Sequence, residues 1–138
     1  MIVYLDSSVI LRKLFRAKDA LEEWGGWEQA LTSEITRVEG LRVIDRLRLE
    51  GQLTDDLVPE CVQSLQDVLD RTDDISLGGT VLYRASLAYP TVIGTLDAIH
   101  LASALLWKER YSKEILFLTH DRQLGKAALS VGLKAEGF

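Results

Sequence analysis

The sequence predicts an α/β fold, a three-layer α/β/α sandwich around a central parallel sheet. Two short segments, Ile2–Asp6 (IVYLD) and Ile115–Thr119 (ILFLT), are rich in β-branched and aromatic residues and are typical of buried strands. Strands that are apolar along their whole length are typical of parallel sheets, because helices cover both faces of such sheets. Strand and helix patterns also alternate along the chain, which predicts parallel strands joined by helical crossovers.

The first half of the chain contains four further expected elements. They are a helix from Ser7 or Ser8 as N-cap to about Arg16, a short helix over Asp19–Trp24, a strand over Ala30–Thr32, and a helix from Ser33 as N-cap to about Glu50. Glycines set two of these limits, since Gly25 and Gly26 follow the short helix and Gly51 follows the long one.

The second half continues the alternation. Its expected elements are a helix beginning near Pro59, a strand over Ile75–Leu77, a helix over Thr80–Ala88, a helix over 95–110 with Thr95 as N-cap, the strand Ile115–Thr119, a helix from Asp121 as N-cap to about Val131, and a final strand over Leu133–Glu136.

The composition is that of an ordinary globular protein. The 138 residues are 47% hydrophobic and 27% charged, and a chain of this length buries roughly two thirds of the surface that its unfolded form exposes. There is no repeat, low-complexity stretch or linker, so residues 1–138 are expected to form a single domain. The formal net charge of −5 argues against a simple nucleic-acid binder, which usually carries net positive charge.

The sequence favours a cytoplasmic location. Cys61 is the single cysteine, which excludes a disulfide framework and makes a reducing compartment the expectation. The first residues, MIVYLDSS, have no basic segment before their apolar stretch and are not typical of a signal peptide. No apolar run reaches the roughly 18–20 residues that a membrane span needs, so no membrane partner is expected.

Four carboxylates are placed where an α/β fold binds ligands. In open α/β sheets, ligands bind in the crevice beyond the carboxyl ends of the strands. Asp6 ends the first strand and Asp121 lies two residues beyond the strand that ends at Thr119, so both face one crevice if these strands are neighbours. Asp97 lies in the first turn of its helix, and Glu39 lies on the helix that follows Ser33.

Glu39 is expected to face inward because it lies beside an apolar side of its helix formed by Ile35, Val38 and Leu41. Four carboxylates in one crevice would repel one another and raise each other's pKa unless a cation compensates them. Hard oxygen ligands suit Mg²⁺ or Mn²⁺, and such ions support phosphate chemistry by activating water and neutralising phosphodiester charge.

Each carboxylate also has a purely structural interpretation. Asp121 can simply cap its helix, and Asp97 can stabilise a helix dipole. Glu39 can pair with Arg42 or Arg46 on the helix surface. Asp6 is hardest to explain in this way, because an acid at the end of a strand in an α/β fold usually serves a ligand.

Four segments together resemble the PIN-domain family of metal-dependent ribonucleases. They are IVYLDSSVIL, TSEITRVEGLR, GTLDAIHLASAL and FLTHDRQLGKAA, and their order and spacing span essentially the whole chain. The chain's size and its SEITRVE segment resemble most closely the VapC toxins of type II toxin–antitoxin pairs. The resemblance implies a sheet with strand order 3-2-1-4-5, which would make the first and fourth strands neighbours.

The same resemblance implies a function and a site. The function would be Mg²⁺- or Mn²⁺-dependent cleavage of RNA, with a cognate antitoxin and a homodimer as partners. By position, Asp6, Glu39, Asp97 and Asp121 match the family's four acids, as catalytic residues and metal ligands. Ser7 and Thr119 match supporting polar positions of the family.

Several other polar residues have two interpretations. His100, one turn after Asp97, can hydrogen-bond to that acid, but we favour a buried structural histidine because Mg²⁺ and Mn²⁺ prefer oxygen ligands. Arg37, Arg42 and Arg12 are candidates for contacts to RNA phosphates, with surface solvation as the alternative for each.

Three alternatives to a toxin nuclease remain open from the sequence. A PIN-type nuclease can serve housekeeping RNA processing instead. A phosphatase with Asp6 as nucleophile would usually have a second acid two residues later, and Ser8 at that position counts against it. A binding module without turnover would show no metal-dependent cleavage under any condition.

Overall fold

A computed structural model describes all residues, Met1–Phe138, and contains one five-stranded parallel sheet. The order of its strands is β3-β2-β1-β4-β5, as predicted. The strands are β1 (Ile2–Leu5), β2 (Gln29–Ser33), β3 (Asp73–Ile75), β4 (Leu116–Leu118) and β5 (Lys134–Glu136). β1 lies at the centre, and it pairs with β2 through Val3 and Ala30 and with β4 through Tyr4 and Phe117.

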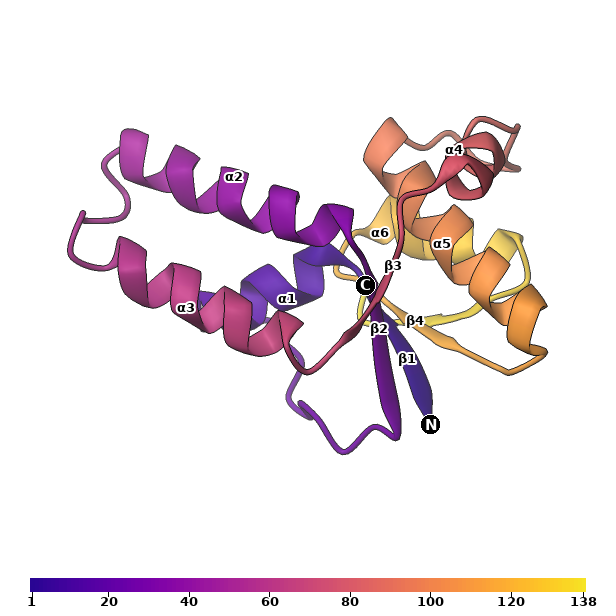
Figure 1. Cartoon of the computed structure of the whole chain (residues 1–138), viewed down its shortest axis with the longest axis horizontal. Coiled ribbons are helices and arrows are strands. Elements are labelled where there is room, and N and C mark those ends of the chain that lie inside the picture. The colour runs from indigo at the N-terminus through magenta and orange to yellow at the C-terminus, as the bar shows by residue number, and fades with distance from the viewer.

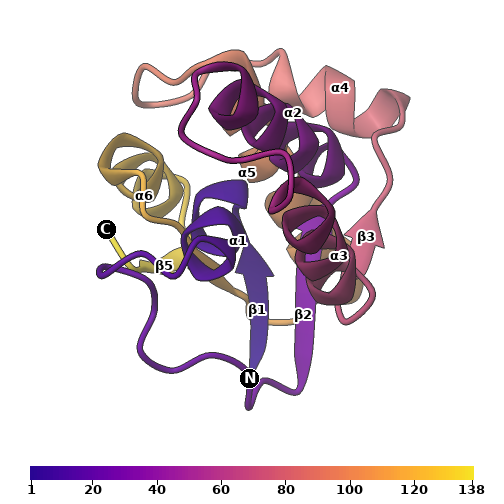
Figure 2. The ribbon, with the colours of Figure 1, turned by 90° about the vertical axis from the view of Figure 1, so that its left-hand side faces the viewer.

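Helices cover both faces of the sheet, which gives the predicted three layers (Figure 1). The helices are α1 (Ser7–Leu14), α2 (Ile35–Leu49), α3 (Val58–Leu69), α4 (Gly79–Ala85), α5 (Thr95–Tyr111) and α6 (Arg122–Ser130). α1, α2 and α3 lie together on one face, which Figure 2 shows from the front. α5 and α6 cover the other face, and α4 packs on α5.

Two hydrophobic cores lie on the two faces of the sheet, and β1 contributes to both. Val3 and Leu5 pack in the core under α1, α2 and α3, whereas Ile2 and Tyr4 pack in the core under α5 and α6. This alternation follows from the two-residue period of a strand. All four β1 side chains are buried. Burial on both faces of the sheet is the physical cause of the near-continuous apolar run that predicted a central parallel strand.

The structure corrects the sequence prediction at three elements. Residues 19–24 form turns and bends, not the expected short helix. β3 spans Asp73–Ile75, two residues earlier than the predicted Ile75–Leu77, because it is an edge strand whose limits are set by backbone pairing with β2. α4 spans Gly79–Ala85 and so ends three residues before the predicted limit at Ala88.

The buried face of α2 also differs from the prediction. Its buried residues are Thr36, Gly40 and Ile44, whereas Val38, assigned to the inward side, is 53% exposed. Gly40 permits this packing, because a Cβ atom there would lie 2.7 Å from Cδ2 of Leu65 on α3. A small residue and a threonine therefore form the inner face, and apolar character alone pointed to the wrong side.

Three expected helix caps are replaced by neighbouring residues. Asp6, not Ser7 or Ser8, is the N-cap of α1, and its side chain accepts a hydrogen bond from the Ser8 N–H. Gly94 precedes α5 in place of the predicted Thr95 cap. Glu34, not Ser33, is the N-cap residue of α2, although Ser33 Oγ accepts the N–H of Ile35 at 3.2 Å. Asp121 caps α6, as predicted. No helix of the structure has the length and apolar character needed to cross a membrane.

Candidate active site

The carboxyl edge of the sheet brings Asp6 and Asp121 to the same place. Asp6 follows β1 directly, and Asp121 lies three residues after β4, the strand paired beside β1. The Asp6 N–H donates to the Leu118 carbonyl oxygen at 3.0 Å, so the end of β1 is tied to the end of β4. The neighbouring-strand condition for a shared crevice is therefore met.

Asp6 is a buried carboxylate, 4% exposed, whose Oδ2 atom is held by three donors. They are Ser8 Oγ at 2.5 Å, Thr119 Oγ1 at 2.9 Å and the Ser8 N–H at 3.3 Å. The Oδ1 atom has a single polar neighbour, His100 Nε2, at 3.5 Å. The pattern leaves Oδ1 as the oxygen available to a ligand. Thr119 thus helps to hold Asp6 in place.

Ser8 has a larger part than its sequence position indicated. Besides donating to Asp6, the Ser8 Oγ accepts a hydrogen bond from the backbone N–H of His120 at 3.0 Å. Ser8 therefore links the start of α1 to the β4–α6 connection. From the sequence, Ser8 was expected only as a possible cap and as the residue in place of a second acid. Its position two residues after Asp6 was the available signal, since short polar side chains bond locally at such helix starts.

Glu39 reaches the site from α2, and both of its oxygens have partners. Ser7 Oγ donates to Oε2 at 3.1 Å, and His100 Nε2 lies 2.6 Å from Oε1. The suggested surface pairs of Glu39 do not form, because Arg42 pairs with Asp45 and Arg46 with Glu50. Glu39 therefore points inward toward His100, and Ser7 holds its other oxygen.

Asp97 lies in the first turn of α5, and its side chain forms no hydrogen bond or ion pair with the protein. Burial raises the pKa of its carboxyl group, and the nearby charges of Asp121, Asp6 and Glu39 raise it further, whereas His100 opposes them. The charges of the other three expected acids thus all act on Asp97. Among the four acids, Asp97 is the one whose carboxylate has no hydrogen bond or ion pair to offset this repulsion.

Asp121 caps its helix, as one of its two interpretations predicted, and its charge also acts on Asp97. Its Oδ1 atom accepts the N–H groups of Gln123 and Leu124 at 2.8 and 2.9 Å, which is an N-cap of α6. The residue is exposed, and its charge is one of those that raise the pKa of Asp97. Capping therefore orients this carboxylate at the rim of the same crevice.

His100 is buried, as the structural interpretation predicted, but its partners belong to the site. The ring is 1% exposed, with Tyr4 Oη 2.8 Å from Nδ1 and Glu39 on the opposite nitrogen. Burial alone would lower the pKa of His100, but the hydrogen bond to Glu39 and the charge of Asp6 outweigh burial and raise it. Tyr4 carries no signal of this contact in the sequence, where it is an ordinary buried strand residue.

The three arginines proposed to bind phosphate do not contact the site carboxylates. Arg12 pairs with Asp19 at 3.1 Å, Arg42 pairs with Asp45 at 3.0 Å, and Arg37 bonds to Gln66. Each is solvent-accessible enough to exchange such a partner for a phosphate, and exposed ion pairs of this kind contribute little stability. Their role in substrate binding stays a prediction.

The donor set fits a hard divalent cation. All four acids offer oxygen, and Asp97 and Asp6 Oδ1 have coordination capacity that the protein itself does not satisfy. No three acidic, histidine or cysteine side chains already converge closely enough to enclose an ion. Mg²⁺ does not require such a cage, because it typically keeps several waters and binds one or two carboxylates.

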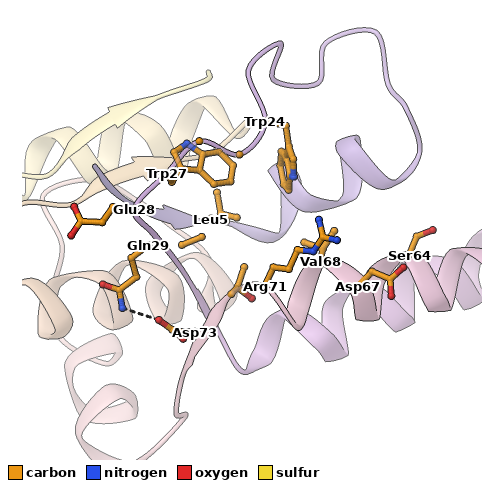
Figure 3. A pocket seen from close by; sticks show the side chains of 14 residues that line it. Leu5, Trp24, Trp27, Glu28, Gln29, Ser64, Asp67, Val68, Arg71 and Asp73 are labelled. Atoms are coloured by element: carbon orange, nitrogen blue, oxygen red, sulfur yellow. Dashed lines mark hydrogen bonds between the residues drawn. The ribbon is translucent and has the colours of Figure 1, made fainter.

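A sizeable cavity of the molecule lies elsewhere. It measures about 600 Å³ and lies between the segment before β2 and the end of α3 (Figure 3). Trp24 and Trp27 lie on one side of it, and Arg71 and Asp67 lie on the other. None of the predicted site residues lines it. The four acids therefore lie outside this cavity.

Comparisons with known proteins agree with this geometry. The family model described as "PIN domain" matches residues 3–129. Ribonuclease VapC47 of Mycobacterium tuberculosis (strain CDC 1551 / Oshkosh) is 30% identical over 137 residues, covering 94% of this chain and 92% of that protein. The crystal structure of VapBC2 from Rickettsia felis bound to a DNA fragment from their promoter contains a similar fold, with a TM-score of 0.67 and 15% identity, covering 99% of this chain and 98% of the other. The chain belongs to the PIN-domain family and is VapC-like within it.

Proposed function

We propose that the chain is a metal-dependent endoribonuclease that hydrolyses RNA phosphodiester bonds, as the toxin of a type II toxin–antitoxin pair. One observation carries the proposal: Asp97 lies unpartnered beside Asp121, Asp6 and Glu39 at the carboxyl edge of the sheet, with its pKa raised by burial and by their charges. A cation relieves this repulsion. The likeness to Ribonuclease VapC47 supports RNA as the substrate.

The chain's own residues would divide the work between holding and orienting. Asp6 Oδ1 and the Asp97 carboxylate are the free oxygens, so we assign them as principal ligands of Mg²⁺ or Mn²⁺. Glu39 and Asp121 would complete the site, directly or through water. When bound, the ion lowers the pKa of a water molecule and neutralises charge on the phosphodiester. Thr119 and Ser8 keep Asp6 fixed by occupying its Oδ2 atom.

The partners we propose are RNA, a cognate antitoxin and a second copy of the chain. The likeness to a VapBC complex supports the antitoxin. A homodimer is supported by exposed apolar side chains on α4, the segment after it and the start of α5, namely Leu82, Tyr83, Leu87, Val92 and Leu96. We further propose that residues 1–138 act as one domain in the cytoplasm.

An RNA cleavage assay tests the catalytic proposal. Wild type is incubated with RNA and Mn²⁺ or Mg²⁺, with EDTA as the chelated control, and is compared with Asp97→Asn. We expect cleavage by wild type with metal, none with EDTA, and loss of at least 100-fold (~3 kcal/mol of barrier) in the variant. Equal cleavage by both proteins, or cleavage that survives EDTA, refutes the mechanism.

Expression in bacteria tests the biological role. A toxin arrests growth when expressed alone, and co-expression of the small protein encoded beside it restores growth. A housekeeping nuclease of the same chemistry would cleave RNA in the first assay and cause no arrest in this one. A covalent phosphoaspartate trapped on Asp6 would instead favour the phosphatase alternative.

A further inference from the structure

A buried hydrogen-bonded chain leads from the central strand to one of the acids. Tyr4 on β1 is fully buried, and its ring stacks on Phe117 with centroids 5.1 Å apart and an interplanar angle of 7°. Its Oη lies 2.8 Å from His100 Nδ1, and the other ring nitrogen lies 2.6 Å from Glu39 Oε1. The three residues come from β1, α5 and α2.

The direction of these bonds follows from the chemistry of the groups. A carboxylate can only accept, so the hydrogen in the bond to Glu39 is on His100 Nε2. In the neutral ring, Nδ1 is then the acceptor, and the Tyr4 hydroxyl donates to it. In the doubly protonated ring, Nε2 still donates to Glu39. The bond to Glu39 is the same in both states of the ring.

Tyr4 is well placed to fix the orientation of the ring. Its hydroxyl is held in a packed core by the stacked aromatic pair, and the imidazole meets it edge-on with centroids 5.9 Å apart. With Nδ1 occupied in this way, Nε2 points toward the acids, 3.5 Å from Asp6 Oδ1. A partner on the remote nitrogen that sets the orientation of a functional imidazole is a general device of metal sites.

Two simpler roles for His100 fit the geometry less well. A metal ligand would need a free ring nitrogen, and both nitrogens of this 1% exposed ring have partners. A purely packing role is met by an apolar side chain, whereas a buried imidazole needs both of its nitrogens satisfied. Here one of those partners is a residue of the site.

We propose that His100, held in place by Tyr4, is a positioning residue that keeps the Glu39 carboxylate aimed at the divalent cation. Ser7 holds Oε2 of the same carboxylate from the start of α1, so His100 and Ser7 clamp it from two sides. The inference rests on the proposed function, because Glu39 needs a precise direction only if it serves an ion.

Two amide variants of His100 separate positioning from packing. In His100→Gln, the amide nitrogen can reach the place of Nε2 and keep a donor toward Glu39. In His100→Asn, the shorter amide reaches only the place of Nδ1 and loses that donor. Both variants put a polar amide in the same core position, so each serves as the control for the other.

The readout is Mn²⁺ affinity of the full chain, measured by titration calorimetry or by the spectrum of free Mn²⁺, with circular dichroism to compare folding. We expect His100→Asn to weaken Mn²⁺ binding by roughly 10- to 100-fold, the usual cost of losing a group that orients a ligand. His100→Gln should restore most of the affinity. Tyr4→Phe removes only the hydroxyl and should cause a smaller loss than His100→Asn, since Nε2 keeps its bond to Glu39.

Equal Mn²⁺ affinity of wild type and His100→Asn overturns the positioning role while leaving the proposed function intact. A wild-type chain that binds no Mn²⁺ refutes the metal site itself and this inference with it. Equal losses in the Asn and Gln variants also overturn the proposal, because they would reflect packing alone.

Nitrogen-15 NMR of the wild-type histidines provides a test that needs no folded variant at position 100. The chain has two histidines, so His120→Gln assigns both sets of signals. His120 Nδ1 lies 2.7 Å from the Gly137 carbonyl oxygen and must donate, which predicts a hydrogen on Nδ1 there. His100 should carry its hydrogen on Nε2, and an unprotonated Nε2 on His100 overturns the proposal.

Discussion

Replacing Thr119 with valine should destabilise the fold through the loss of one hydroxyl group. Thr119 is fully buried just after β4, and its Oγ1 donates to Asp6 Oδ2 at 2.9 Å and accepts the Asp121 N–H at 3.0 Å. Valine has nearly the same shape but cannot form either bond. The buried carboxylate of Asp6 would then depend on Ser8 alone for donors to Oδ2.

The expected magnitude follows from the two bonds. A hydrogen bond to a charged group contributes about 1.5–3 kcal/mol. Asp121 is itself exposed, so water can replace the lost acceptor of its N–H group at little cost. We therefore expect Thr119→Val to lower the free energy of unfolding by about 2–3 kcal/mol. Thr119→Ser keeps the hydroxyl and removes a buried methyl group, which costs about 1 kcal/mol.

Urea unfolding followed by tryptophan fluorescence, with EDTA present, measures both variants. For an m-value of about 1.5 kcal/mol/M, the valine variant should have its midpoint lowered by about 1.3–2 M and the serine variant by less than 1 M. The order of the two urea midpoints shows whether the hydroxyl or the methyl group of Thr119 matters more for stability. If serine is as destabilising as valine, or more so, packing and not the hydrogen bonds determines the role of Thr119.

Two further predictions concern acids whose ionised form the fold disfavours. Asp97→Asn should raise the urea midpoint in EDTA, because burial and the charge of Asp121 raise the pKa of Asp97. Added Mn²⁺ should stabilise wild type but not the variant. A variant that is no more stable than wild type in EDTA contradicts this prediction. Asp74→Asn should raise the melting temperature at pH 7, because partial desolvation of this exposed side chain and the Glu34 charge raise the pKa of Asp74, so its ionisation destabilises the fold as pH rises. That gain should vanish below about pH 4, where the carboxyl group is protonated in both states, and a gain that persists there would exclude the charge as its cause.

The central strands could be predicted because their signal is local. β1 and β4 are short runs of apolar residues, and strands covered on both faces must be apolar along their whole length. β3 offers no such signal, since Asp73 and Asp74 are exposed and the strand exists through its backbone pairing with β2. The predicted helix over residues 19–24 failed in a similar way, because that segment packs through Leu21 and Trp24 against the core under α1 and α3.

Three of the four proposed site acids could be located from the sequence because each lies at the boundary of an element. Asp6 and Asp121 are helix N-caps that follow strands, and Asp97 is in the first turn of α5. Such boundaries can be identified from sequence spacing, and the resemblance to PIN-domain proteins supplied the strand order that brings them together. Glu39 was placed correctly, although the apolar side used to place it was not the buried face of α2.

The sequence by itself determined the fold class, the central strands and the four carboxylates that belong to one edge of the sheet. Only the tertiary structure decided how each carboxylate is held, because hydrogen-bond partners come from distant parts of the chain. Tyr4 and His100 are 96 residues apart, and His100 and Glu39 are 61 residues apart. His100 was expected to be buried, and it is, but a local pattern cannot show which groups a buried imidazole bonds to, since strand order and helix packing bring those groups into contact.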